Sequence, residues 1–456
     1  MGRHPKRSPV LRWAIRGISA IGARPGSRIA HRRYMLVAVP VLLQERRLGD
    51  YAGVTPQGML GGLRLKARPL VGLRVLHLSA SPFASAVAET LGALVPLQRS
   101  LGIEADWQLL NGGTPRVWST IYEGLNGAKV RWGWKERNAW YQCARGQAAS
   151  IPSGYDVIVV HDPQPTPLAQ VRTHWGDNPR WIWHCHSDIR GANPEVRTDL
   201  FRAVQGYDAA LFPSPDLVPR DAPVPLKKVA RPAIDPCSLR NAPLPPSVVE
   251  AITARIGLDP TRPILGQFGP LDHRFEPLAA LGTFWLARRE IPGLQIVLAD
   301  LATGLPIRFR HGTEQVLEAA NGDPDIRVLT PEADLGATGI NALQRTLSIA
   351  LQLAVPAGFG RSLAECHWKG KPSVVGPHGQ LPEQVADGEA GVVARGALEA
   401  ASAVVELLRS PIYAQELGRR ARAHVEQNYL ITGLAADYVD VLRRLTSMDC
   451  AIGGDL

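Results

Sequence analysis

The sequence predicts an α/β fold made of two doubly wound parallel sheets that face each other across a cleft. Short apolar runs alternate with amphipathic stretches of helical period, which is typical of parallel strands joined by crossover helices. The chain has 456 residues, about three times the ~150 residues of a common single domain, so two domains are expected. Ten prolines within residues 213–246 mark a hinge between them, because proline fits poorly inside a helix or sheet.

Each half of the sequence supplies its own strands and helices. Helices are expected at Ser85–Ser100 in the first half and at Leu278–Glu290 and Leu398–Leu408 in the second. One strand is expected within the proline-rich hinge. Apolar runs predict the other strands at Leu73–Ser79, Asp156–Val160, Trp181–His184, Ala209–Phe212, Pro263–Phe268, Leu294–Ala299, Ile326–Leu329, Ile349–Leu353 and Ser373–Val375.

The formal net charge of +10 is concentrated at the start of the chain. Residues 1–33 hold nine basic side chains and no acidic one, so the rest of the chain carries a net charge of only +1. This balance, and the lack of basic side chains interleaved with aromatic ones, argues against nucleic-acid binding. Weak contact of residues 1–33 with an anionic membrane stays open.

Nothing in the sequence indicates membrane insertion or secretion. The longest apolar run, Met35–Leu43, is too short to span a bilayer. The arginine pair Arg32 and Arg33 before it resembles the start of an export signal, but no small-residue cleavage site follows. The five cysteines are scattered and never form a C-x-x-C pair, so neither a disulfide framework nor a zinc site is expected. A cytoplasmic protein fits this pattern best.

The most informative segment of the second half runs from Gly358 to Glu365. Gly358, Phe359 and Gly360 lie between a predicted strand and a helix that begins near Arg361. Glycines in such a turn let backbone amides approach a ligand, and a helix N-terminus favours a phosphate. Glu365, about one turn into the helix, is then placed to accept hydrogen bonds from a ribose. The alternative is a tight turn followed by a solvated glutamate.

The first half places polar residues at the ends of two neighbouring strands. His161 and Asp162 follow one strand, and His184 and His186 end the next. The carboxyl ends of parallel strands meet at one edge of a sheet, where ligands of open α/β sheets bind. Histidine and carboxylate groups there suit a polyhydroxylated substrate. The alternative for His161 and His184 is that both are packed core histidines.

A series of segments from about Leu48 to Leu445 resembles one known family. The segments occur in the family's order, and H-D-P-Q-P is specific to its subgroup. They are Arg74–His77, Val87–Glu89, His161–Pro165, Trp181–Trp183, Cys185–His186, Tyr207–Ala210, Ile234–Pro236, Asn341–Arg345, Gly358–Gly360 and Trp368–Pro372. On these residues the sequence resembles the trehalose glycosyltransferring synthases, retaining GT-B glycosyltransferases related to retaining trehalose phosphorylases.

The resemblance implies transfer of a hexose from a nucleotide sugar to a sugar acceptor, with retention at the anomeric carbon and with neither a metal nor another cofactor. In the family an Arg, a Lys, helix-N-terminal amides and an E-x7-E pair hold the departing diphosphate and the sugar. His186 matches the position that contacts the transferred sugar. The donor phosphates are expected at Gly358, Phe359, Gly360, Ser362 and Leu363.

The resemblance also assigns roles to the parts of the chain. Residues 1–34 are expected to be a basic tail, 35–235 the acceptor domain, 236–430 the nucleotide-sugar domain, and 431–456 a C-terminal helix that returns to the first domain. A homodimer stays open. Substrate contacts in the acceptor domain are expected from His161, Asp162, Gln164 and Asp188.

Several positions depart from the family's pattern, and they cluster where the donor is expected. Gln267 replaces the family's Arg and Asp272 its Lys, and one preorganised donor is typically worth ~3 kcal/mol. Gln267 and Arg274 are still expected to contact the substrate, although Arg274 could replace the lysine only if its loop is rearranged. Ala357 stands where the first Glu of the E-x7-E pair is expected, and Ala84–Ala86 where the family has a glycine-rich loop.

Arg361 also departs from the family's pattern, but it adds a positive charge where the family usually has an apolar residue. A guanidinium at a helix N-terminus is a candidate phosphate clamp, and the alternative is an exposed surface arginine. We therefore expect His186, Arg361 and Glu365 to be the catalytic residues. Two functions stay open: an active retaining glycosyltransferase, or a homologue that has lost transfer chemistry and binds a sugar or a partner.

Overall fold

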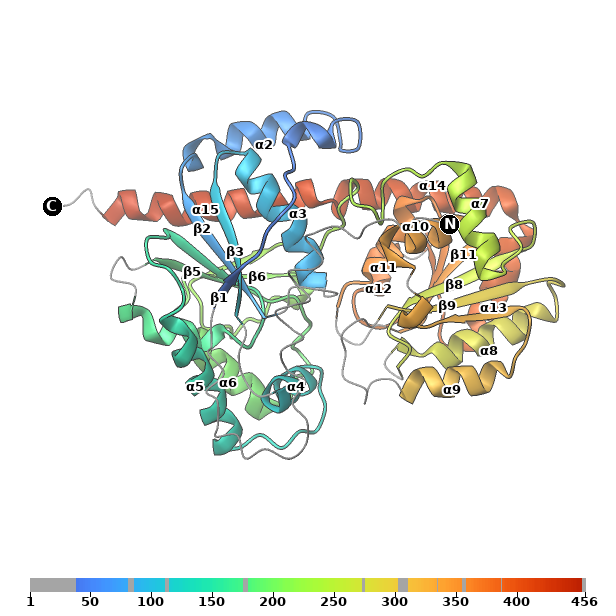
Figure 1. Ribbon diagram of the computed structural model, residues 1–456, viewed down its shortest axis with the longest axis horizontal. Coiled ribbons are helices and arrows are strands. Elements are labelled where there is room, and N and C mark those ends of the chain that lie inside the picture. The colour runs from blue at the N-terminus through green and yellow to red at the C-terminus, as the bar shows by residue number, and fades with distance from the viewer. Residues whose placement is uncertain are drawn as a thin grey trace, which may run out of the picture. The chain divides into compact units, whose positions relative to one another are not determined.

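The computed structural model describes residues 38–80, 86–110, 115–174, 179–272, 275–301, 311–333, 335–354, 358–386 and 388–452. Within these ranges the protein is an α/β structure with two mainly parallel sheets, one in each half of the sequence (Figure 1). The predicted fold class is therefore confirmed. The basic segment at residues 1–33 lies outside the described residues.

The first sheet has the strand order β1-β3-β2-β4-β5-β6-β7. β1 pairs antiparallel with β3, and the other pairs are parallel. The strand expected within the proline-rich hinge is β7, which pairs with β6 at the edge of the sheet. The strands are β1 (Ala38–Pro40), β2 (Arg74–Ser79), β3 (Glu104–Leu110), β4 (Val157–Val160), β5 (Arg180–His184), β6 (Ala209–Phe212) and β7 (Leu226–Val229).

The second sheet has the order β10-β9-β8-β11-β12-β13, and all of its pairs are parallel. β8 and β9, next to each other in the middle of the sheet, are buried at every residue. The strands are β8 (Ile264–Gly269), β9 (Gln295–Asp300), β10 (Ile326–Leu329), β11 (Ile349–Gln352), β12 (Ser373–Val375) and β13 (Val392–Val393).

All nine strands that apolar runs predict are present, each within one residue of its predicted bounds. Parallel strands covered by helices on both faces are buried throughout, so they appear in the sequence as continuous apolar runs. β1 and β3 escape this pattern. β1 has only three residues, and β3 alternates between buried and partly exposed positions.

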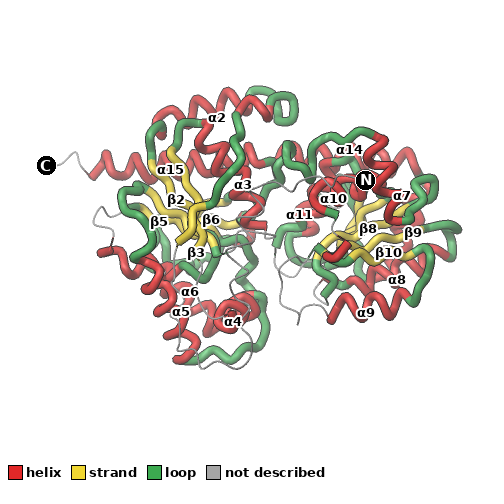
Figure 2. The backbone as a smooth tube through the Cα atoms, viewed as in Figure 1, coloured by secondary structure: helices red, strands yellow, loops and turns green. Residues whose placement is uncertain are grey.

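Helices follow most strands and cover the sheets (Figure 2). The three predicted helices correspond to α3, α8 and α13, although Ser85 lies outside the described residues. α6 begins where the Asn193 side chain accepts the backbone N–H groups of Glu195 and Val196, a standard N-cap. The helices are α2 (Met59–Ala67), α3 (Ala86–Ser100), α4 (Pro115–Leu125), α5 (Trp134–Ala148), α6 (Pro194–Val204), α7 (Pro246–Ile256), α8 (Pro277–Arg288), α9 (His311–Ala320), α10 (Gly336–Thr346), α11 (Arg361–Trp368), α12 (Leu381–Val385), α13 (Ala397–Arg409), α14 (Pro411–Asn428) and α15 (Ile431–Ile452).

α15 packs on the first half of the chain although it follows the second half in sequence. It contacts α2 and α3, and Leu434, Tyr438 and Leu442 are buried in the apolar cluster that those helices share. The backbone N–H of Ile431 donates to the oxygen of Ile234 at 3.0 Å, and that of Ile234 donates to Tyr429 at 2.8 Å. These bonds fix where α15 starts. The boundaries proposed at residues 35, 235 and 430 stay predictions.

Among the described helices, none combines the length and the apolar character that crossing a membrane requires.

Candidate functional site

The turn before α11 is closely packed at Gly360, and this explains the glycine there. The backbone N–H of Gly360 donates to Oε1 of Gln384 at 2.8 Å, and a Cβ at position 360 would lie 3.0 Å from that oxygen and 3.1 Å from Leu381. A Cβ at Gly358 would lie 4.0 Å from the backbone oxygen of His186. The turn therefore lies beside the polar segment of the first half.

The other predicted phosphate-binding residues lie at or beside this turn. Phe359 packs on Tyr429 with the ring centroids 5.1 Å apart. Ser362 and Leu363 occupy the first turn of α11, where backbone N–H groups lack partners within the helix. These amides and the helix dipole form the part of the site that favours an anion.

Glu365 is buried, so the alternative of a solvated glutamate is wrong. Only 1% of its side chain is exposed. Its Oε2 accepts from Nε2 of Gln344 at 3.0 Å and lies 3.5 Å from Nη1 of Arg240. Within the described part of the chain, its Oε1 has no hydrogen-bond partner, and neither has Oε1 of Gln344. Two buried acceptors on neighbouring side chains thus lack a donor from the described residues.

Arg361 is also mostly buried, so the alternative of an exposed surface arginine is wrong. Its side chain is 15% exposed, and Nη1 lies 3.3 Å from a carboxylate oxygen of Glu89 on α3. Its Nη2 donates to Oγ1 of Thr90 at 2.7 Å and to the oxygen of Ala86 at 2.9 Å. The predicted phosphate clamp is therefore held by acceptors of α3.

Two further cations beside α11 escaped sequence reasoning. Arg240 lies between Glu89 and Glu365, 3.5 Å from each; burial lowers its pKa, but these two carboxylates outweigh burial and raise it. Nζ of Lys369 donates to Oδ1 of Asn241 at 2.9 Å. Burial lowers the pKa of Lys369 to about 8, against the attraction of Glu365. Both cations lie within or next to segments that resemble the family, and this position is the sequence signal that could have identified them.

We call Arg240, Gln344, Arg361, Glu365 and Lys369 the α11 cluster.

Four histidines of the first sheet lie together, and we call them the histidine cluster. His77 is inside β2, whereas the other three lie at or just after the ends of β4 and β5. His77 Nδ1 lies 2.9 Å from His161 Nε2, and His161 Nδ1 lies 3.1 Å from His186 Nε2. The rings of His184 and His186 are tilted by 30°, with centroids 3.9 Å apart. Burial is the main cause that lowers the pKa of all four rings, to about 4 for His77 and about 3 for His186. All four are neutral at pH 7.

His161 and His184 have the surroundings expected of packed core histidines, the alternative stated for them from the sequence. Both are buried, with 2% and 3% exposure, and both bond to other side chains rather than only to the backbone. His186 is partly exposed. It is therefore the member of the histidine cluster that a ligand can reach.

Three more predicted residues lie near these strand ends. Oδ2 of Asp162 accepts the backbone N–H of Ala80 at 2.6 Å; burial raises the pKa of Asp162 to about 6. Gln164 has a buried Oε1 for which the described part of the chain provides no partner. Asp188 is paired with Arg190 at 2.7 Å; burial raises its pKa, but the bonds from Arg190 outweigh burial and lower it.

The positions that depart from the family are described only in part. Gln267 is buried, and its Nε2 donates to the backbone oxygen of Phe275 at 2.9 Å, while its Oε1 has no partner among the described residues. Asp272 is buried as well. Arg274, Ala357, Ala84 and Ser85 lie outside the described residues. The amide of Gln267 is thus used to hold the segment after β8.

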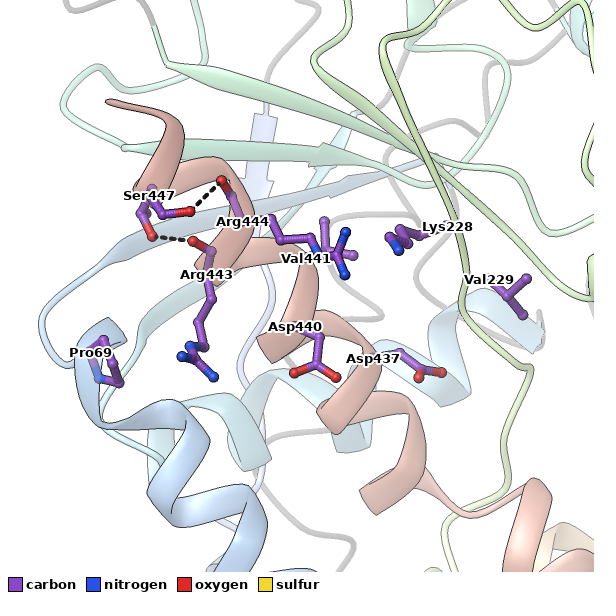
Figure 3. Close-up of a pocket in the computed structure, with 10 residues that line it drawn as sticks. Pro69, Lys228, Val229, Asp437, Asp440, Val441, Arg443, Arg444 and Ser447 are labelled. Carbon is purple, nitrogen blue, oxygen red and sulfur yellow. Dashed lines mark hydrogen bonds between the residues drawn. The ribbon is translucent and has the colours of Figure 1, made fainter. Parts of the chain in front are cut away.

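A cavity of about 740 Å³ lies elsewhere, where α15 meets β7 (Figure 3). None of the predicted site residues lines it. Its charged groups are of both signs, so it does not favour a single kind of ion. It is lined by Pro69, Lys228, Val229, Asp437, Asp440, Val441, Arg443, Arg444, Thr446 and Ser447.

Comparison with known proteins agrees with this arrangement. Residues 77–219 match the family described as trehalose synthase, N-terminal domain. Trehalose synthase of Rubrobacter xylanophilus is 31% identical over 406 residues, which cover 88% of this chain and 97% of the relative. Trehalose synthase of Pyrococcus horikoshii is 31% identical over 405 residues, with the same coverage. The α,α-trehalose 6-phosphate synthase of Burkholderia multivorans has a similar fold, with a TM-score of 0.63 at 13% identity over 84% of this chain and 98% of that one.

The two mainly parallel sheets and the solved structures they resemble define the fold of the chain as GT-B. The first half matches the trehalose synthase N-terminal domain, and two relatives exceed 30% identity over most of the chain. The chain therefore belongs to the trehalose synthase family, and it is a glycosyltransferase of the trehalose-synthase type.

Proposed function

We propose that the chain transfers a hexose from a nucleotide sugar to a sugar hydroxyl with retention at the anomeric carbon. Glu365 carries this proposal. A buried carboxylate oxygen without a donor costs about 1–3 kcal/mol. Glu365 Oε1 lacks a donor among the described residues, and so does Oε1 of Gln344, whose Nε2 bonds the other carboxylate oxygen of Glu365. Ribose or hexose hydroxyls are donors that can satisfy such acceptors.

The diphosphate of the donor would be held by α11 and its cations. Gln267 and Asp272 leave the family's two cationic positions without positive charge, whereas Arg361 and Arg240 add it beside the first turn of α11. Both arginines share Glu89 as a partner. A diphosphate carries more negative charge than one carboxylate, so it can replace Glu89 as the partner of Arg361.

His186 would contact the transferred sugar as a neutral hydrogen-bonding group. Its pKa of about 3, set first by burial and then by Arg361, makes it a poor base at neutral pH. Retention does not demand a base on the far side of the sugar. As the bond between the anomeric carbon and the phosphate oxygen breaks, the acceptor hydroxyl attacks on the same face, and the departing oxygen takes its proton.

Calorimetric titration of the full chain with UDP, ADP and GDP tests this proposal. The matching NDP-glucose is then supplied with free glucose, and the released diphosphate and the disaccharide are measured. We expect one nucleotide to bind and its sugar to be transferred. Absence of nucleotide binding at millimolar concentration would reject the proposal.

The same titrations reveal the alternative of a homologue without transfer chemistry. Such a protein would bind glucose or a disaccharide at the polar strand ends of the first sheet but would not bind any of the three nucleotides. The buried Gln267 and Asp272 at the family's cationic positions are the observations that favour it. Sugar binding without nucleotide binding would therefore establish this second function.

A further inference from the structure

Three members of the histidine cluster are arranged so that their lone pairs can meet. His161 follows β4, His184 ends β5 and His186 lies two residues further on. One ring nitrogen from each lies within 4.8 Å of the others, and no second group of three potential ligands of this kind occurs among the described residues. Imidazole nitrogen is a preferred ligand of zinc and its neighbours in the first transition row.

Outer hydrogen bonds hold one nitrogen each of His161 and His184, so that their other nitrogens face the centre of this group. There Nδ1 of His161 shares a hydrogen bond with Nε2 of His186, which a metal ion bound to both nitrogens would replace. Oε1 of Gln98 is 2.8 Å from Nε2 of His77, whose Nδ1 is 2.9 Å from Nε2 of His161. If each ring donates toward Gln98, the lone pair of His161 is on Nδ1. Nδ1 of His184 bonds the hydroxyl of Tyr438 at 2.6 Å, which leaves Nε2 of His184. Histidines that bind metals are anchored in this way through their second nitrogen.

The distance between the nitrogens of His161 and His186 suits a metal ion. His161 Nδ1 and His186 Nε2 are 3.1 Å apart, close to the ~3.3 Å between two nitrogens bound tetrahedrally to zinc at about 2.0–2.1 Å. The partial exposure of His186 leaves one coordination position for water or a sugar hydroxyl.

We propose that His161, His184 and His186 form a three-histidine site for a divalent transition-metal ion, with Zn²⁺ as its first candidate. The sequence predicts no metal, because the ligands come from two strand ends and lack the spacing of a zinc motif. The one local signal is the pair His184-x-His186, since alternate residues of an extended chain point to the same side. The site does not depend on the proposed transferase activity.

Metal titration of the full chain, made without a polyhistidine tag and dialysed against EDTA, tests the site. We expect one equivalent of Zn²⁺ to bind with micromolar affinity or tighter in calorimetry. Co²⁺ should give the visible absorption of a tetrahedral ion with nitrogen ligands. His161→Ala and His184→Ala should each weaken Zn²⁺ binding at least tenfold. His378→Ala, which removes an exposed histidine of the second half, is the matched control and should change nothing.

A milder variant keeps the test decisive if these replacements fail to fold. Tyr438→Phe removes only the hydroxyl that anchors His184, and loss of such an outer partner typically weakens metal binding by about 10–100-fold. The proposal would be overturned if the folded wild type did not bind Zn²⁺. It would also be overturned if none of the variants His161→Ala, His184→Ala and Tyr438→Phe weakened Zn²⁺ binding. The histidines would then form a hydrogen-bonded core network only.

Discussion

The histidine cluster and the α11 cluster are both largely buried, but only the α11 cluster holds charged groups. In the histidine cluster, burial lowers every pKa, and neutral rings bond one another. In the α11 cluster, Arg240 and Glu365 form an ion pair, yet Glu365 Oε1 and Gln344 Oε1 lack donors among the described residues. Because of this difference, the proposed function assigns recognition of a charged donor to the α11 cluster. The histidine cluster supplies neutral groups of fixed orientation.

Acidification should disrupt the histidine cluster, with the largest expected effect. The pKa of His77 is about 4 in the folded chain, below its ordinary 6.5, so its stabilising contribution is complete above pH 6.5 and is lost as pH falls toward 4. Between pH 7 and pH 5 the lowered pKa of His77 alone accounts for a loss of about 2 kcal/mol. The other three rings add to this loss.

Urea unfolding at the two pH values measures this change in the free energy of unfolding. Asp162, whose pKa is raised to about 6, takes up a proton in the folded state between pH 7 and pH 5. This uptake offsets about 1 kcal/mol of the loss in the free energy of unfolding. His77→Gln removes one titrating ring and should reduce the loss by about 2 kcal/mol. An equal loss in the variant and the wild type would show that His77 is not buried in its neutral form.

Glu365→Gln tests the α11 cluster directly. The amide keeps the shape of the side chain but removes the charge opposite Arg240 and one of the two acceptors. We expect kcat/KM for sugar transfer to fall about 100-fold, the usual effect of losing one preorganised polar group. Glu389→Gln, at an exposed position of the same half, should leave the rate unchanged. A loss of less than threefold for Glu365→Gln would remove Glu365 from the site.

Arg361→Ala should weaken nucleotide binding by about tenfold or more, because a charged hydrogen-bond donor to the diphosphate is lost. Calorimetry with the nucleotide that binds the wild type measures this effect. Arg395 is an exposed arginine of the same half, and Arg395→Ala is the matched control. Unchanged affinity in Arg361→Ala would reject the phosphate clamp and leave this arginine as a contact to α3 only.

Glu89→Gln should have the smallest effect and the opposite sign. It releases Arg361 and Arg240 from a partly exposed carboxylate, and a pair of this kind is worth about 0.2–1 kcal/mol. Nucleotide affinity should therefore rise about two- to fivefold. In an Arg361→Ala background the gain should shrink, and this coupling is the evidence for competition at Arg361. Equal gains in both backgrounds would contradict it.

Prediction from sequence succeeded where a pattern is local. Nine of the thirteen described strands were found to within one residue, because burial on both faces leaves a continuous apolar run. The turn Gly358–Gly360 and the start of α11 at Arg361 follow from glycine chemistry in the same way. β3 was missed because buried and partly exposed positions alternate along it. In the sequence, such a stretch of mixed composition resembles a loop.

The partners of the site residues could not be predicted in this way. Arg240, Glu365 and Glu89 are far apart in the sequence, and no local pattern states that one arginine lies 3.5 Å from each carboxylate. The sequence alternatives for Glu365 and Arg361 assumed exposure to solvent. Both are wrong because α10, α3 and the segment after β7 cover them.

By itself the sequence determined the two-sheet α/β fold, the position of α11 and the polar strand ends, since these depend on hydrophobic period and on glycine and proline geometry within a few residues. Only the tertiary structure decided which of the polar groups are neutral, which are paired and which lack partners. Those properties depend on burial and on distances between side chains from different elements, which packing of the complete chain creates.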